Sequence, residues 1–152
     1  MSHRDAAYKA WQTIWRRAPA RKAARTAKWA RTMTKWVVTH SHRGGARWKI
    51  VDFGGSKGAE SRGIVDLMAV RKDHRPTDAR FKPGDLFEII LVQVKGGGAA
   101  HPTADDRLRL RAVAKRYRAR VVLSSWERQG APEIYLLRDD RWVEKSPVDI
   151  FG

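Results

Sequence analysis

Two apolar segments of strand length, joined by a polar connection, constrain the fold of this chain more than any other feature. The segments are Gly63–Val70 and Phe87–Lys95, and both are rich in β-branched residues. The connection between them is polar and contains two prolines and a glycine, which is typical of an exposed turn. The pattern therefore predicts a β-hairpin whose two strands belong to a larger sheet.

Each segment carries polar side chains where a buried strand normally avoids them. Asp66 lies in the first segment. Gln93 and Lys95 lie two positions apart in the second, so they point to the same face of a strand. Burying an acid and a lysine without partners costs several kcal/mol. A metal ion that gathers a carboxylate, an amide and an ammonium group would justify that cost.

The charge balance predicts an anionic polymer as partner. The 152 residues hold 32 Lys and Arg against 16 Asp and Glu, a formal net charge of +16. Residues 1–49 contribute 13 − 1 = +12, and residues 50–152 contribute 19 − 15 = +4. Nucleic acid is the first choice of partner, and an acidic membrane surface is the second.

Composition excludes several classes of protein. The chain has no cysteine, which excludes a disulfide scaffold and a cysteine-ligated zinc site. The N-terminus lacks the apolar core of a signal peptide, and no apolar run approaches the roughly 20 residues that span a bilayer. We expect a soluble, cytoplasmic protein associated with the nucleoid, and the length suggests one compact domain with a terminal extension.

The N-terminal third predicts basic helices. Residues 4–17 and 20–34 fit two helices separated by Pro19. Residues 1–36 would form a basic segment that packs on or extends an α/β domain of residues 37–152. Aromatic residues at helical spacing either face the core or stack on unpaired bases; they are Tyr8, Trp11, Trp15, Trp29 and Trp36, with Met33 between the last two. The basic side chains expected to contact phosphate, here and later in the chain, are Arg16, Arg17, Arg21, Lys22, Arg25, Lys28, Arg62, Arg107 and Arg111.

The remaining elements complete an α/β pattern. A helix is predicted at residues 103–118, where Thr103 and Asp106 have capping-box spacing. The further strands expected are residues 36–40, 48–53, 120–124, 133–137 and an edge at 141–143. The strands at 36–40 and 48–53 could pair as a hairpin around a Gly-Gly turn.

The order of these elements and their motifs resemble a known family. Gly-x-x-Asp on one strand, a hairpin connection, a strand ending in Gln-Val-Lys-Gly, a basic helix and a further strand resemble the PD-(D/E)xK nuclease superfamily. Within it, the pattern is most similar to archaeal-type Holliday junction resolvases and small phage or mobile-element endonucleases. The resemblance covers roughly residues 48–137. It implies a restriction-endonuclease-like α/β core with a mixed central sheet flanked by helices.

The resemblance also implies an activity and roles for residues. The activity is metal-dependent cleavage of DNA by a homodimer that acts on branched substrates during recombination or repair. Asp66 would bind Mg²⁺ or Mn²⁺, together with the amide oxygen of Gln93 and the backbone carbonyl of Val94. Lys95 would orient the attacking water and stabilise charge on the phosphate.

The chain differs from the usual pattern of the family in the acidic residues of the site. Gln93 stands where the family usually has Glu, which removes a negative charge and lowers the expected metal affinity. Glu60 is our first choice for an additional acid, ahead of Asp52. Glu88 is an odd number of positions from Gln93, so we expect it to face away. The first helix offers only Asp5.

Other interpretations stay open at this stage. Asp66 could form a structural salt bridge with Lys95. His40 and His42 would share one face of a strand, where they could bind a metal but would more often meet solvent or phosphate. The whole chain could be a non-catalytic nucleic-acid-binding module on a degenerate nuclease fold, or the end-cutting subunit of a mobile element.

Overall fold

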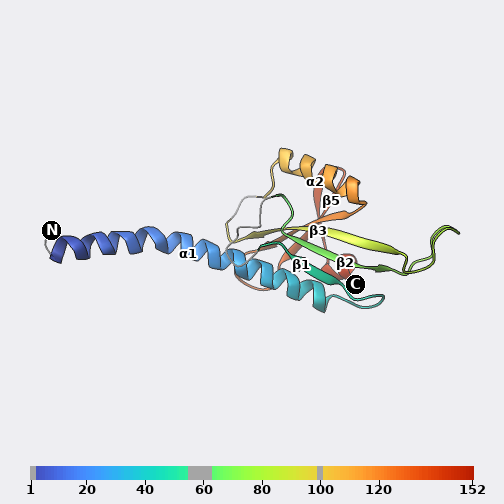
Figure 1. The fold of residues 1–152 in the computed structure, drawn as a ribbon, viewed down its shortest axis with the longest axis horizontal. Coiled ribbons are helices and arrows are strands. Elements are labelled where there is room, and N and C mark those ends of the chain that lie inside the picture. Colours follow the sequence, from blue (N-terminus) through green and yellow to red (C-terminus); the bar gives the residue numbers. More distant parts are fainter. Residues whose placement is uncertain (1–2, 55–62, 99–100) are drawn as a thin grey trace.

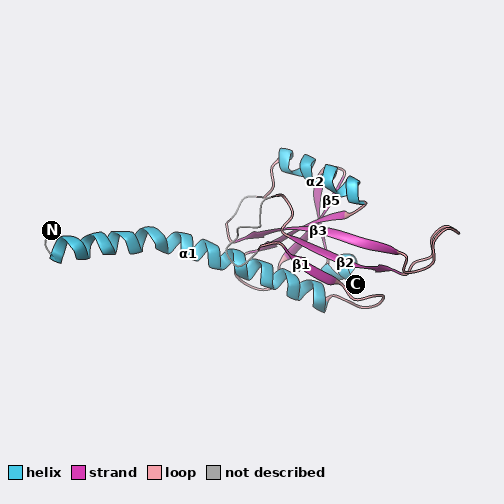
Figure 2. Ribbon diagram, viewed as in Figure 1, coloured by secondary structure: helices cyan, strands magenta, loops and turns pink. Residues whose placement is uncertain are grey.

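The computed structural model is an α/β protein in which helices flank a six-stranded mixed sheet (Figures 1 and 2). It describes residues 3–54, 63–98 and 101–152. The α/β class and the mixed sheet flanked by helices are as predicted. In chain order the elements are α1 (His3–His40), β1 (Lys49–Asp52), β2 (Leu67–Asp73), β3 (Leu86–Gly96), α2 (Ala104–Tyr117), β4 (Arg120–Trp126), β5 (Glu133–Arg138), β6 (Arg141–Lys145) and α3 (Pro147–Phe151).

The strands lie in the sheet in their sequence order, from β1 to β6. All neighbours are antiparallel except β3 and β4, which are parallel and are connected through α2. A parallel pair needs such a crossover, because its second strand must start again at the same end. The predicted hairpin is present, since β2 pairs with β3 from Leu67–Val92 to Asp73–Leu86.

The main core lies on one face of the sheet, under α1 and α3. Strand alternation directs Leu67, Ile90 and Val92 to this face, where they join Val38 of α1 and Phe151 of α3 in one buried cluster. Burying each such side chain contributes roughly 1.5–3 kcal/mol. The other face lies towards α2 (Figure 1), and this helix contributes one fully buried residue, Leu110. Thr103 and Asp106 form the predicted capping box at its start.

The first helix differs most from the prediction. It continues through Pro19 and through residues 36–40, so the separate helices, the strand at 36–40 and its hairpin are wrong. Proline costs one helical hydrogen bond, and the Ala-, Arg- and Lys-rich sequence around it offsets part of that cost. Val37 and Val38 suggested a strand, but both are buried on the sheet one turn after Thr34, and this packing outweighs their β propensity.

The aromatic stripe predicted for this helix is displaced by one residue from the true buried face. Ala30, Thr34, Val37 and Val38 are buried at helical spacing, whereas Trp29 is 57% and Trp36 is 51% exposed. These two tryptophans are therefore not core residues. In Figure 1 the N-terminal half of α1 extends beyond the sheet.

The two histidines also differ from the prediction, because they do not share a strand. His40 is the last residue of α1, and its ring stacks on Trp36 with 4.2 Å between the ring centroids. Its Nδ1 donates to the Trp36 carbonyl over 2.8 Å. His42 lies in the following turn, with Nε2 3.0 Å from the carbonyl oxygen of Gly45. The interpretation that these two histidines bind a metal from one face of a strand is therefore wrong.

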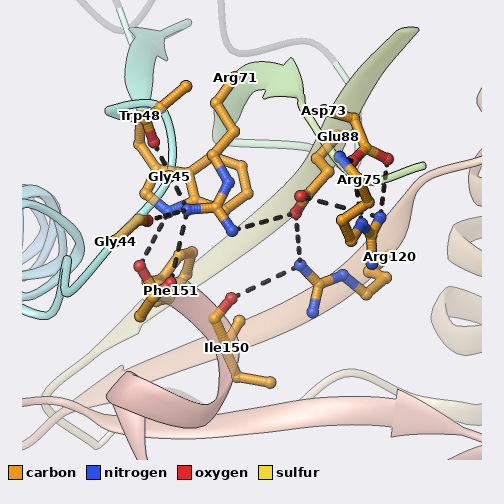
Figure 3. Close-up of polar contacts among 12 residues, drawn as sticks. Gly44, Gly45, Trp48, Arg71, Asp73, Arg75, Glu88, Arg120, Ile150 and Phe151 are labelled. Carbon is orange, nitrogen blue, oxygen red and sulfur yellow. Dashed lines mark hydrogen bonds and ion pairs between the residues drawn. The ribbon is translucent and has the colours of Figure 1, made fainter. Parts of the chain in front are cut away.

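One end of the sheet is held by an ion cluster around Glu88 of β3 (Figure 3). The Glu88 carboxylate, 12% exposed, is 3.3 Å from Arg71 Nη2 and 3.5 Å from Arg120 Nη2. Arg71 also lies over the Trp48 ring, 4.2 Å from its centroid, and its Nη1 is 3.4 Å from the carbonyl oxygen of Gly152. The cluster therefore ties β2, β3, β4 and the C-terminus together.

Glu88→Gln should destabilise the fold by about 3 kcal/mol, because it leaves Arg71 and Arg120 without their counter-charge at a partly buried position. For a chain of this size we expect a fall in Tm of about 6–12 °C, measured by circular dichroism. The control Glu127→Gln changes an exposed acid after β4 and should shift Tm by less than about 2 °C. Equal falls in Tm for Glu88→Gln and Glu127→Gln would show that the ion cluster contributes nothing to the stability of the fold.

Candidate active site

Asp66 is fixed at the point where β2 begins. Its N–H donates to the Val92 carbonyl over 3.0 Å, and its carbonyl accepts from Phe53 N–H over 3.1 Å. Its side-chain Oδ2 accepts from the Val94 N–H over 2.7 Å. The ladder between β2 and β3 ends at the Leu67–Val92 pair. The carboxylate of Asp66 thus takes the place of the next backbone acceptor, and it holds the side chain against β3.

Gln93 is buried next to this contact, at 8% exposure. Its Oε1 has no hydrogen-bond partner within the described part of the chain. An unsatisfied buried acceptor costs about 1–3 kcal/mol, so a cation or a donor that reaches Oε1 would recover that energy. In an extended strand the N–H and C=O of one residue point to the same edge. The Val94 carbonyl therefore faces the same side as the N–H that contacts Asp66.

The three predicted metal ligands thus come from neighbouring positions at one end of β2 and β3. They supply a carboxylate, an amide oxygen and a backbone carbonyl, which are the donors that hard divalent cations prefer. The charge is low, because no group of three or more His, Cys, Asp or Glu gathers in residues 3–54, 63–98 and 101–152. The residues present fit Mg²⁺ or Mn²⁺ if water or a substrate phosphate completes the ligand set.

Lys95 follows two positions after Gln93 and is half-buried beside Ser125 of β4. Burial raises the pKa of the Asp66 carboxyl, and the positive charge of Lys95 offsets part of that rise. No ion pair within 4.0 Å joins the two described side chains, so the structural salt bridge considered from the sequence is not formed. In residues 3–54, 63–98 and 101–152 the Lys95 ammonium group forms no ion pair within 4.0 Å.

Asp52 of β1 lies near Asp66, but α1 neutralises it. Its Oδ2 is 2.6 Å from Lys35 Nζ, and its Oδ1 accepts from Gly54 N–H over 2.8 Å and lies 3.7 Å from Arg31 Nε. Burial acts to raise the pKa of Asp52, but the contacts with Lys35, Gly54 and Arg31 outweigh it, and the net pKa is lowered. Both oxygens are engaged, which makes Asp52 a poor additional metal ligand.

Two other acids considered from the sequence, Asp5 and Glu88, are not brought to the site. Asp5 precedes Ala30 by 25 positions on α1, which is roughly 38 Å of helix, and Ala30 is where the helix meets β3. Glu88 belongs to the ion cluster and faces away, as predicted. Glu60, our first choice, lies outside the described residues, and so does Arg62.

The remaining predicted DNA contacts fall in different places. Lys22, Arg25 and Lys28 are exposed on α1. The side chains of Arg16, Arg17 and Arg21 on the same helix lie outside the described residues. Arg107 is half-buried and donates to the Pro102 carbonyl over 3.3 Å.

Arg111 lies 3.7 Å from Asp140 and lines a groove of about 960 Å³ between α2 and the end of β5. This groove includes Arg120, at the start of β4, and is therefore at the opposite end of that strand from the candidate site. Sequence reasoning did not find this groove, because its apolar floor is built from Val121, Leu137 and Ile150 of three separate elements.

The chain matches no protein-family model, no curated protein and no solved structure with which it was compared. Among the described helices, none is long and apolar enough to cross a membrane. The function must therefore be inferred from the residues of the site.

Asp66→Asn should make the protein more stable at pH 7. Burial raises the pKa of Asp66, and the Val94 N–H, Lys95 and Arg31 offset this only in part. The folded state therefore holds the proton more tightly than the unfolded state, so stability falls as pH rises from the unfolded pKa through the raised folded one. Asparagine at position 66 does not ionise, so the variant does not lose this stability as the pH rises. Thermal unfolding should show a higher Tm for the variant at pH 7 and a smaller difference at pH 3.

The exposed acid Asp139 in the β5–β6 turn provides the control, and Asp139→Asn should leave Tm nearly unchanged at both pH values. A variant Asp66→Asn that is less stable than the wild type at pH 7 would contradict the account, since it would mean that the charged carboxylate is stabilised where it lies.

Proposed function

We propose that this protein is a metal-dependent DNA endonuclease with a restriction-endonuclease-like core. The observation that carries the proposal is the buried Oε1 of Gln93, which has no hydrogen-bond partner among the described residues. Gln93 directly precedes Val94, whose N–H binds the Asp66 carboxylate, and Lys95 follows on the same strand. A buried amide oxygen without a donor suits a site that receives a cation.

The arrangement of elements supports the same proposal. The chain begins with a helix, three antiparallel strands, a helix and a strand parallel to the third. This is the order expected from the resemblance to PD-(D/E)xK nucleases. It places Asp66 at the end of one strand and Gln93 and Lys95 on its neighbour. The net charge of +16 supports an anionic polymer as substrate.

The roles follow from the chemistry of each group. Asp66, Gln93 and the Val94 carbonyl would hold Mg²⁺ or Mn²⁺. When bound, such an ion supplies Lewis acidity at a phosphate and lowers the pKa of a bound water. Lys95 would donate to a non-bridging phosphate oxygen and orient the attacking water. Arg31, held near Asp66 by Asp52, adds positive charge to the surface that a phosphate approaches.

Branched DNA, such as a four-way junction, is the substrate class that we propose on the resemblance. A junction needs two symmetric cuts, and an isologous dimer provides two sites related by a two-fold axis. We therefore propose a homodimer that acts in the cytoplasm on the chromosome or on a mobile element.

A second candidate is a DNA-binding module without catalysis. The observation that favours it is the shortage of acid at the site, since Asp66 is the one carboxylate there among the described residues that is not paired with a base. Metal dependence separates the two candidates, because a pure binder responds to salt but does not need the ion.

Asp66→Ala and Lys95→Ala should each lower metal-dependent cleavage by at least about 100-fold, because the first removes a ligand and the second a charged donor to the phosphate. The measurement uses labelled four-way junction, flap, single-stranded and linear duplex DNA with Mg²⁺, with Mn²⁺ and with a chelator. Lys49→Ala, on the outer strand β1, is the matched control and should cleave normally. Tight binding with no cleavage of any substrate would sink the nuclease proposal and leave the binding module.

Gln93→Glu should lower the Mg²⁺ concentration needed for half-maximal activity by roughly tenfold, because the added carboxylate attracts a cation that one acid holds weakly. The metal-dependent rise in Tm gives a second measurement that does not depend on cleavage. Gln129→Glu, an exposed change in the β4–β5 turn, adds the same charge away from the site and should change neither. An identical metal dependence for wild type and Gln93→Glu would place the ion elsewhere.

A further inference from the structure

A small basic and aromatic pocket lies at the end of β4, where α1 crosses the sheet. Its volume is about 310 Å³, and the described residues that line it are Lys22, Arg25, Thr26, Trp29, Trp126 and Arg128. No acid is among them. The lining thus combines two indole rings with three cationic side chains, which is unusual for a surface that meets only water.

The position of this pocket is fixed by a close contact between α1 and the end of β3. A Cβ atom on Gly96 would lie 3.0 Å from Ala30 Cβ and 3.2 Å from the Thr26 carbonyl oxygen, so glycine permits the approach. Gly96 pairs with Trp126 on β4 and directly follows Lys95. The pocket therefore lies at the same end of the sheet as the candidate active site. It is on the face that α1 covers, whereas strand alternation directs the Gln93 and Lys95 side chains to the other face.

The two tryptophans of the pocket differ in their exposure and in how firmly their rings are held. Trp29 is 57% exposed on α1. Trp126 is half-buried, and its Nε1 donates to the Gly130 carbonyl over 3.1 Å, which fixes the orientation of its ring. An exposed indole beside a fixed one is a suitable stacking surface for a planar, uncharged ring.

None of the three cations is paired with an acid in the part of the chain that the structure describes. Within the described residues, Lys22, Arg25 and Arg128 form no ion pair within 4.0 Å. This differs from Arg31 and Lys35 on the same helix, which are engaged with Asp52. Free cations around stacking rings match the composition of one nucleotide, whose base is planar and whose phosphate is anionic.

We propose that this pocket binds an unpaired nucleotide of the DNA substrate. Stacking requires a base whose face is accessible, and in a duplex both faces are covered by neighbours. The pocket would therefore select DNA that carries an unpaired strand at this end of the sheet, as at a flap or the centre of a junction. The connection to cleavage rests on the proposed function, whereas the nucleotide site itself does not.

The test measures binding in chelator, so that cleavage does not contribute. Fluorescence anisotropy is recorded with a labelled single strand of about ten thymidines and with a duplex of equal length. Trp29→Ala should weaken single-strand binding at least about fivefold, the lower end of base-stacking effects, and leave duplex binding within about twofold. Trp29→Phe should restore much of the loss, because a ring is again available.

Trp36→Ala is the matched control, since Trp36 is 51% exposed on the same helix but lies against His40, outside the pocket. It should alter neither affinity. Arg25→Ala should lower the slope of log affinity against log salt for the single strand by about 0.7, as expected for one lost phosphate contact.

The outcomes also separate this proposal from the nuclease. Equal losses for single strand and duplex in Trp29→Ala, or no loss, would overturn the nucleotide site even if metal-dependent cleavage is found. A selective loss supports the site whether or not the protein cleaves DNA, and in that second case only the endonuclease proposal fails.

Discussion

The close approach of α1 to the ends of β3 and β4 determines where most other groups lie. Gly96 admits the helix at Ala30, and the Thr34 hydroxyl lies 2.6 Å from the Ser124 hydroxyl, both fully buried. Thr34 also bonds back to the Ala30 carbonyl over 2.7 Å, which leaves neither hydroxyl unsatisfied. With this face fixed, helical geometry sends Arg31 and Lys35 to Asp52 on one side and leaves Trp29 exposed on the other.

Charge is arranged differently at the two ends of the sheet. At one end, Glu88 is surrounded by Arg71, Arg75 and Arg120, so opposite charges are matched inside the protein and the C-terminus is held. At the other end, α1 supplies bases that exceed the acids available. A positive end with few internal partners attracts phosphate, whereas a matched cluster contributes mainly to stability. The ion cluster that stabilises the fold and the positive surface of the proposed DNA site thus lie at opposite ends of the strands.

Local signals were sufficient for the parts of the fold that depend on local rules. Alternation and β-branched residues predicted the β2–β3 hairpin, capping-box spacing predicted the start of α2, and strand parity predicted that Glu88 faces away. The predicted end of the first helix was wrong because Val37 and Val38 are β-branched, and only tertiary packing makes them helical.

The neutralisation of Asp52 by Lys35 also depends on α1 crossing the sheet, and no sequence spacing encodes that. Helix α3 was missed although Ser146 and Pro147 are a normal helix start, because its five residues are too few to show periodicity.

The glutamine at position 93 is consistent with this electrostatic arrangement. A glutamate there would place a second partly buried carboxylate next to Asp66, and two such charges raise each other's pKa and destabilise the ion-free protein. Gln93 avoids that repulsion, and its Oε1 is left without a partner among the described residues instead. In the proposed nuclease, such a site would hold a cation only weakly when DNA is absent. Magnesium sites commonly combine one or two carboxylates with substrate phosphates, so a phosphate drawn in by Arg31 and Lys95 would supply the missing negative charge. The ion and the DNA would then bind cooperatively, which confines metal-dependent chemistry to the protein that already holds its substrate.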